Sequence, residues 1–294
     1  MTSDLWQQIV KTTEQALKSG ALQPIATQRQ FISDAKLNFC VRVLDNLTRK
    51  EAAKKSQPSA SGKKPFNPFL PYEEALFVDN LSDTHVCLLN KYNVVDHHIL
   101  IVTREYELQD NWLTQADFEA LVYCLTQIDG LGFYNGGTQA GASQHHKHLQ
   151  IVPFTSAKGA QELPLSELIN AEKYHLEKNL QLPSLPFRHS IQTFTIQWTK
   201  PTLLANSQKL FKTFQDLVVD VGLNLDAAKP DIPYNLLLTR EWMMVVPRSQ
   251  ESYADIGVNS LGYSGWLLVK TDEDLERLKA IGPMTLLQTV GKHI

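Results

Sequence analysis

The sequence has few cysteines, no long apolar run and no excess of charge of one sign, and each absence disfavours a class of protein. The three cysteines among 294 residues, Cys40, Cys87 and Cys124, form no CxxC pair, which argues against a disulfide framework and a cysteine-rich zinc site. No stretch approaches the roughly 18 consecutive apolar residues of a membrane helix. The 28 basic and 31 acidic residues leave a net charge of -3, which disfavours a nucleic-acid-binding surface over the whole protein.

The first residues carry no targeting pattern. Met1-Thr2-Ser3-Asp4 is not a basic segment followed by an apolar stretch, so we expect no signal peptide, no membrane partner and a cytoplasmic location. With 43% hydrophobic residues, the chain can bury one large core or two small ones.

Helical and strand patterns mix along the chain without strict strand–helix–strand alternation. The clearest helix begins near Thr114 and Asp117, which resemble a capping box, and ends at Gly130. Residues 234–239 and 242–247 predict a hairpin. These patterns predict an α+β fold with a mixed, largely antiparallel sheet and flanking helices. The alternation of Phe194, Ile196 and Trp198 predicts a further strand.

Residues 49–64 differ from the rest of the chain because they combine basic residues with Ser, Pro and Gly and hold almost no large apolar residue. This composition predicts a mobile basic loop. It is either a solvated linker or a loop that closes on a polyanion, in which case Lys64 is the best-placed cation.

The most informative stretch runs from Asn135 to Val152 and holds three of the nine histidines within four positions. Alternate residues of a strand share a face, so His146, His148 and Gln150 are expected to lie together. The preceding loop is rich in glycine, which allows backbone N–H groups to approach an anion.

Three interpretations of His146 and His148 compete. They could be packed, hydrogen-bonded histidines, or two ligands of a zinc ion, although no Cys, Asp or Glu at suitable spacing supplies the remaining ligands. The third interpretation is nucleophilic catalysis on phosphorus, in which a neutral imidazole forms a phosphoramidate. That chemistry needs a nucleophile, a group that fixes its tautomer and donors for phosphate oxygens, and this segment offers all three.

The run His146-Lys147-His148-Leu149-Gln150 resembles the histidine-triad signature in the variant with glutamine in place of the third histidine. That variant belongs to the nucleotidyl-transferring branch. Further blocks are similar to the diadenosine tetraphosphate phosphorylase family, also called ATP adenylyltransferases. These blocks are residues 67–72, 89–98, 141–144, 234–239, 242–248 and 259–263, followed by Gly265 and Lys270.

The resemblance implies an enzyme that splits diadenosine tetraphosphate with phosphate into ATP and ADP, reversibly, through a covalent AMP-histidine. It assigns His148 as the nucleophile, while His146 orients the site, contacts ribose or simply packs. It also implies a histidine-triad-like catalytic part over residues 1–155, with an insertion at 49–64. An ATP adenylyltransferase-like part over 156–294 is expected to pack with it into one unit.

Gln150 supports a hypothesis of its own. An amide donates hydrogen bonds but delivers no proton at neutral pH, so this site suits a leaving group such as ATP that departs as an anion. We expect the AMP-histidine to persist until phosphate, rather than water, accepts the AMP.

The expected substrate contacts lie on both sides of the motif. Asn135 and the loop of Gly141, Ala142, Ser143 and Gln144 are the expected phosphate cradle, and Asn90, Lys91 and Lys64 are expected near the polyphosphate. The resemblance adds Asn259, Ser260, Leu261, Trp266 and Lys270. Trp266 stands where the family often has methionine but keeps an apolar surface for a base. Alternatively, Lys91 and Lys64 are ordinary surface residues. The C-terminal residues from Asn259 to Lys270 would then simply form a core strand and its turn.

A divalent cation, Mg²⁺ by preference, is expected to travel on the substrate phosphates, with no organic cofactor and no dedicated metal site. The expected partners are dinucleoside polyphosphate, ATP, ADP and phosphate, and no nucleic acid. Two rival functions stay open: ADP-forming exchange between adenylylsulfate and phosphate, and a non-catalytic dinucleotide sensor. His97 and His98 open a strand, and either a nucleoside contact or a structural role fits them.

Overall fold

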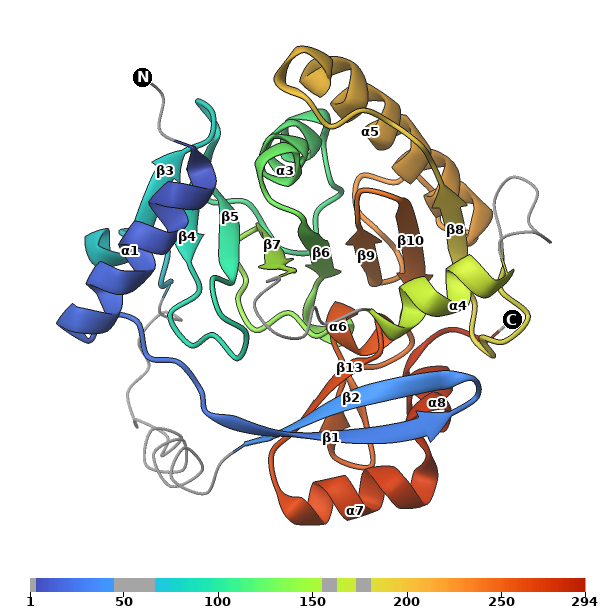
Figure 1. Cartoon of the computed structure of the whole chain (residues 1–294). Coiled ribbons are helices and arrows are strands. Elements are labelled where there is room, and N and C mark those ends of the chain that lie inside the picture. Colours follow the sequence, from blue (N-terminus) through green and yellow to red (C-terminus); the bar gives the residue numbers. More distant parts are fainter. Residues whose placement is uncertain (1–3, 45–66, 155–162, 173–180, 294) are drawn as a thin grey trace.

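An eight-stranded antiparallel sheet forms the centre of the molecule (Figure 1). The computed structural model describes residues 4–44, 67–154, 163–172 and 181–293. The strand order is β3-β4-β5-β7-β6-β9-β10-β8, so strands from both halves of the chain lie in one sheet. The bounds are β3 Phe77–Asn80, β4 His85–Leu89, β5 Ile99–Thr103, β6 Gly130–Gly136, β7 His148–Pro153, β8 Ser190–Thr193, β9 Tyr234–Leu238 and β10 Trp242–Pro247.

Three helices cover one face of this sheet: α1 (Leu5–Ser19), α3 (Gln115–Gln127) and α5 (Leu203–Asp220) (Figure 1). Helix α3 approaches β6 closely because Gly132 lacks a side chain; a Cβ there would lie 2.9 Å from Cδ1 of Leu121. Leu149 and Ile151 of β7 belong to this apolar core. The alternate residues of β7 therefore face the other side of the sheet.

A second layer lies against that other side. Strands β1 (Thr27–Asp34) and β2 (Leu37–Leu44) form an antiparallel hairpin, and β13 (Trp266–Val269) pairs with β2 in parallel. Their apolar side chains share a core with Phe133 of β6 and Val152 of β7. The helices of this layer are α4 (Pro164–Glu172), α6 (Ser260–Tyr263), α7 (Asp272–Ile281) and α8 (Pro283–Val290). The short elements are η1 Glu74–Leu76, η2 Thr138–Ala140, η4 Lys200–Thr202, β11 Ser252–Tyr253 and β12 Ile256–Gly257.

The predicted α+β class is confirmed, and so are two of its local signals. The Thr114 side chain accepts the Asp117 N–H, and the Asp117 carboxylate accepts the Thr114 N–H, as in a capping box. The hairpin predicted for the second half is the pair β9 and β10, with Val245 opposite Leu236.

The strand predicted from Phe194, Ile196 and Trp198 is wrong. The strand of this region is β8, which ends at Thr193 and pairs with β10. The three apolar side chains are only partly buried against the first core, and the indole N–H of Trp198 donates to the carbonyl of Arg240 at 3.0 Å. Alternation therefore marked packing of an irregular segment rather than ladder pairing.

Two further predictions stay predictions. The basic segment 49–64, with Lys64, lies outside the described residues. The division of the chain near residue 155 is not tested by the sheet, to which strands on both sides contribute. Within the described part of the chain, every helix is too short or too polar to cross a membrane.

Candidate active site

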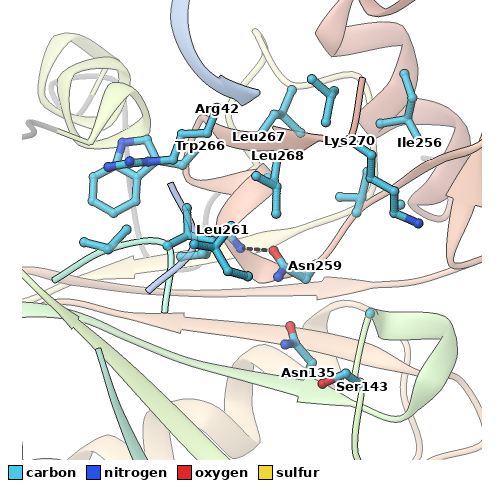
Figure 2. A pocket seen from close by; sticks show the side chains of 18 of the residues that line it. Arg42, Asn135, Ser143, Ile256, Asn259, Leu261, Trp266, Leu267, Leu268 and Lys270 are labelled. Carbon is cyan, nitrogen blue, oxygen red and sulfur yellow. Dashed lines mark hydrogen bonds between the residues drawn. The ribbon is translucent and has the colours of Figure 1, made fainter. Parts of the chain in front are cut away.

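A cleft of about 540 Å³ separates the central sheet from the layer of β2 and β13. Figure 2 shows Asn135 and Ser143 on one side of it and Trp266, Leu268 and Lys270 on the other. The cleft brings together nine of the residues predicted from the sequence: Asn90, Asn135, Gly141, Ser143, Gln150, Asn259, Leu261, Trp266 and Lys270. The central sheet thus supplies one wall of the site, and β2 together with the C-terminal segment around β13 supplies the other.

His148 begins β7 and is 4% exposed, so it does not line the cleft itself. It lies two residues, or about 7 Å, along the strand from Gln150 on the same face. Its Nδ1 lies 2.8 Å from the carbonyl oxygen of His146 and must donate to it, because a carbonyl only accepts. Nε2 therefore carries the lone pair, and no described residue engages it.

Burial lowers the pKa of His148 to about 4, and the nearby His146 adds to this effect, although the hydrogen bond to the His146 carbonyl opposes it. The imidazole is therefore neutral at pH 7, the form that a nucleophile needs. The ring of Phe69 covers both histidines, with ring centroids 5.3 Å from His148 and 5.7 Å from His146.

A chain of hydrogen bonds orients Gln150. The Asn90 Oδ1 accepts the N–H of Tyr92, so its Nδ2 donates to Nδ1 of His98 at 3.2 Å. Burial lowers the pKa of His98 to about 4, so the ring is neutral and carries its proton on Nε2. The Nε2–H of His98 donates a hydrogen bond to Oε1 of Gln150 at 3.1 Å. The amide NH₂ of Gln150, unengaged by any described residue, is left as a donor on the cleft wall.

Asn135 is oriented in the same manner from the other half of the chain. Its Oδ1 accepts from Nδ2 of Asn235 at 2.9 Å and from the backbone N–H of Ser260 at 2.9 Å. Asn235 is held in turn by Arg248, whose Nη1 donates to its Oδ1 at 2.8 Å. All four residues are buried, and the Asn135 NH₂ has no partner among the described residues. A second amide donor therefore lines the cleft.

The remaining predicted residues lie outside the cleft lining. His146 Nε2 donates to the carbonyl of Thr103 at 2.9 Å and its Nδ1 accepts from Asn67 at 3.1 Å, so both ring nitrogens are engaged by protein. Ser260 is fully buried, and Lys91 forms an ion pair with Glu73 at 2.6 Å. Ala142 and Gln144 flank Ser143 without lining the cleft.

Gly141 allows its loop to approach the C-terminal segment around Asn259 closely. Its φ is +88°, and a Cβ built there would lie 2.7 Å from Cβ of Asn259 and 2.7 Å from the carbonyl oxygen of Val258. A side chain at this position would push the loop away from the C-terminal segment. The absence of a side chain at Gly141 thus allows the two walls of the cleft to come together here.

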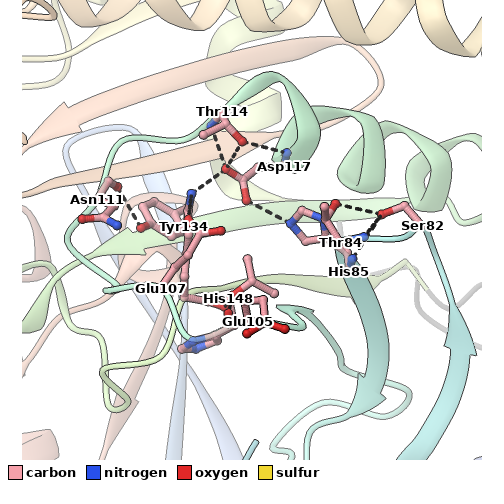
Figure 3. Close-up of polar contacts among 12 residues, drawn as sticks. Ser82, Thr84, His85, Glu105, Glu107, Asn111, Thr114, Asp117, Tyr134 and His148 are labelled. Atoms are coloured by element: carbon pink, nitrogen blue, oxygen red, sulfur yellow. Dashed lines mark hydrogen bonds and ion pairs between the residues drawn. The ribbon is translucent and has the colours of Figure 1, made fainter. Parts of the chain in front are cut away.

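The residue before β7, Lys147, is anchored in a buried ion cluster beside His148 (Figure 3). Lys147 is fully buried, and its Nζ contacts Asp117 at 2.6 Å and Glu107 at 3.2 Å. His85 donates to the other oxygen of Asp117 at 3.0 Å. Burial acts to raise the pKa of Asp117, but the hydrogen bond from His85 and the charge of Lys147 lower it below its usual value.

Sequence reasoning missed or left open several residues that build this site. His98 was left between two roles, and Asn235 was seen only as part of a strand. Arg42 of β2 lines the cleft, and its alternation with buried Val41 and Val43 was the available signal that it faces away from their core. Arg248 was seen only as the last residue of the block 242–248. It is 1% exposed and bonded to protein oxygens.

The described residues contain no group of three or more His, Cys, Asp or Glu side chains arranged to hold a metal ion. The polar lining of the cleft combines asparagine and glutamine amides on the sheet side with Arg42 and Lys270 opposite, and it also includes the carboxylates of Glu251, Asp255 and Asp274. The amide, guanidinium and ammonium donors of this lining suit phosphate oxygens.

Two family models together match most of the chain. The model described as "Ap4A phosphorylase N-terminal domain" matches residues 1–171, and the one described as "ATP adenylyltransferase C-terminal domain" matches residues 183–293. Diadenosine 5',5'''-P1,P4-tetraphosphate phosphorylase 2 of Saccharomyces cerevisiae is 29% identical over 296 residues, which cover 90% of this chain and 86% of that protein. Protein APA1 of the same yeast is 32% identical over 65% of this chain and 63% of its own length.

Solved structures agree with these matches. The crystal structure of yeast Ap4A phosphorylase Apa2 superimposes with a TM-score of 0.75 and 25% identity, covering 99% of this chain and 98% of that one. The same protein in complex with Ap4A gives a TM-score of 0.73 and 27% identity, over 98% and 97% of the two chains.

Proposed function

Because the chain belongs to the Ap4A phosphorylase (ATP adenylyltransferase) family of nucleotidyltransferases, we propose that it splits diadenosine tetraphosphate with phosphate into ATP and ADP. The similarity to Apa2 solved with Ap4A bound supports a dinucleoside polyphosphate as the substrate. ATP, ADP and phosphate complete the proposed set of small-molecule partners, since the reaction is reversible.

The first step is attack by Nε2 of His148 on the α-phosphorus. A P–N bond forms, the P–O bond to the leaving group breaks, and ATP departs with the bonding electrons. The imidazole then holds phosphorus on Nε2 and a proton on Nδ1, so it carries a positive charge. The carbonyl of His146, 2.8 Å from Nδ1, stabilises that charge without accepting the proton.

In the second step an oxygen of inorganic phosphate attacks the same phosphorus. The P–N bond breaks, ADP leaves, and His148 returns to its neutral form with the proton still on Nδ1. No proton has to be exchanged with a protein side chain in either step, which agrees with an amide at Gln150. We therefore propose that AMP release to water is slower than ADP formation.

The two oriented amides, Asn135 and Gln150, are proposed to donate to the phosphoryl oxygens as charge develops on them. Removing one such donor typically costs about 3 kcal/mol of transition-state stabilisation. Lys270 and Arg42, which line the opposite wall, are proposed to meet further phosphates, and Trp266 is proposed to offer a flat apolar surface to a base. A divalent cation, Mg²⁺ by preference, is proposed to arrive with the substrate and neutralise the departing triphosphate.

The substrate must reach Nε2 of His148 before the reaction can begin. His148 is 4% exposed beneath Phe69, so adenylylation requires this ring to move aside. Phe69 lies directly after Pro68, outside any regular strand, where a side-chain rearrangement breaks no ladder hydrogen bond.

The observation that carries the proposal is the hydrogen bond from His148 Nδ1 to the His146 carbonyl, which leaves Nε2 as the reactive nitrogen. Product analysis tests it. Incubation with diadenosine tetraphosphate, Mg²⁺ and phosphate should give ATP and ADP in equal amounts. Adenylylsulfate in place of the dinucleotide tests the rival exchange reaction. Tight dinucleotide binding without products would instead favour the sensor.

A further inference from the structure

Gln109 occupies a buried position in the connection between β5 and α3, beside the start of β7. It is 3% exposed. Its backbone N–H donates to the carbonyl of His145 at 2.8 Å, and Leu108 forms an antiparallel bridge with His146. The Lys147 N–H donates to the carbonyl of Glu107 at 2.9 Å. The segment 107–109 thus runs antiparallel along the chain that leads into the nucleophile.

The side chain of Gln109 stands where the ladder between β6 and β7 stops. That ladder pairs Gly130 with Pro153 and continues in register to Phe133 and Gln150. Continued in the same register, Tyr134 would pair with Leu149 and Asn135 with His148, but the ladder includes neither pair. The strands are therefore open at the two residues proposed to attack and to hold the phosphoryl group.

The amide of Gln109 fills this opening. Its Oε1 accepts the backbone N–H of His148 at 2.8 Å, and its Nε2 donates to the carbonyl of His148 at 3.1 Å. The same Nε2 donates to the carbonyl of Asn135 at 2.9 Å. One side-chain amide thus replaces the backbone pairing that a closed ladder would supply, and both of its hydrogens are used.

We propose that Gln109 is a positioning residue that sets the spacing and orientation of His148 and Asn135 across the opened ladder. This inference rests on the proposed function, because it takes His148 as the nucleophile and Asn135 as a phosphate donor. An amide bonded to both strands holds them apart at a fixed width. An apolar side chain would leave one buried N–H and two carbonyls short of partners, and the strands would rearrange.

The variant Gln109→Glu tests this role with almost no change in shape. A carboxylate oxygen takes the place of Nε2 and meets two carbonyl oxygens, so the charged form repels both strands. We expect kcat at pH 7.5 to fall roughly 100-fold with KM within about threefold, as for a small displacement of reacting groups.

The pH profile separates positioning from general damage. A protonated carboxyl group regains one donor, so the activity of Gln109→Glu relative to wild type should rise from pH 7.5 to pH 5. The nucleophile stays neutral over this range, since burial holds the pKa of His148 at about 4. A ratio that does not change with pH, or a kcat equal to wild type at pH 7.5, would overturn the inference.

Gln127→Glu is the matched control. Gln127 accepts the N–H of Leu5 at 3.3 Å and donates to the carbonyl of Tyr123 at 3.4 Å, and its helix lies on the other face of the sheet. We expect this variant to lose stability but keep the wild-type kcat at both pH values. If Gln109→Glu does not fold, Gln109→Asn keeps a neutral amide that is one methylene too short to reach both strands, and the same loss of kcat is expected.

A readout without turnover keeps the inference separate from the proposed function. The Nδ1–H proton of His148 is held by a carbonyl, and its NMR resonance reports the geometry of that hydrogen bond. The resonance should shift in Gln109→Glu and stay in place in Gln127→Glu. An inactive wild type together with this shift would reject the phosphorylase function but keep the positioning role. An unshifted resonance would reject the positioning role in either case.

Discussion

At the scale of single residues, the site depends on amide groups whose oxygens are already occupied. His98 holds the oxygen of Gln150, and Asn235 with Ser260 holds the oxygen of Asn135, so each NH₂ is presented to the cleft. The sequence indicated which residue types were needed and where they stand along the chain. It gave no sign of their orientation, because the partners of Asn135 lie 100 and 125 positions away.

The variant Asn135→Asp isolates this orientation. The aspartate keeps an oxygen for Asn235 and Ser260 but turns the second oxygen, in place of the NH₂, toward the cleft. We expect kcat/KM for phosphorolysis to fall about 100-fold, because a donor is replaced by a repelling acceptor. Asn206→Asp, which also loses a buried donor to a carbonyl, is the control and should keep wild-type kinetics. Equal activity of the two variants would remove Asn135 from the phosphate site.

At the scale of elements, β7 carries the candidate site on one face, and the residue before it, Lys147, enters a buried ion cluster. The capping box of α3 was readable from Thr114 and Asp117, because capping is local and depends on a spacing of three residues. Asp117 also binds Lys147 of the triad segment, which lies 30 positions away in the sequence. No local sequence pattern indicates this second contact. The strand predicted at 194–198 is wrong for a similar reason. The alternation of apolar residues is local and does not show whether a neighbouring strand is available to pair with the segment.

The ion pair between α3 and the start of β7 gives a stability prediction. Lys147→Met leaves the Asp117 carboxylate buried without its cation, and the free energy of unfolding should fall by about 3–5 kcal/mol. Adding Asp117→Asn removes the unpaired charge, so the double variant should recover part of this loss. Denaturant unfolding of the two single variants and the double variant measures the coupling. If the double variant loses the sum of the two single losses, the pair is not coupled.

At the scale of the whole molecule, strands from both halves form one sheet, and the C-terminal half holds Asn135 in place through Asn235 and Arg248. This explains why the sequence signal for the candidate site is spread over the chain: the motif around His148 holds the proposed nucleophile, and distant residues hold the side chains around it in place. The fold class followed from hairpin and helix patterns. The cleft between the two layers did not, because it depends on how those layers pack.

Buried neutral histidines make the stability of the whole protein depend on pH. Burial lowers the pKa values of His98, His148 and His189 to about 4, below the usual 6.5. The unfolded chain therefore takes up protons between pH 6.5 and 4 that the folded chain does not, and stability falls as pH falls through this window. At pH 5 we expect a loss of roughly 1–2 kcal/mol per histidine relative to pH 7.

Denaturant unfolding at pH 7, 6 and 5 measures this loss, and NMR titration assigns it to individual rings. His189→Gln, remote from the cleft, should reduce the slope by about one third while leaving the titration of His98 and His148 unchanged. A protein that is as stable at pH 5 as at pH 7, or a His148 ring that titrates near 6.5, would contradict the burial argument.

The most direct test of the account is intact-protein mass spectrometry after mixing the protein with diadenosine tetraphosphate and Mg²⁺ in the absence of phosphate. We predict a mass gain equal to one AMP, which disappears when phosphate is added and never forms in His148→Ala. No adduct in a wild-type protein that turns over the substrate, or an adduct that persists in His148→Ala, would contradict the assignment of His148 as the nucleophile.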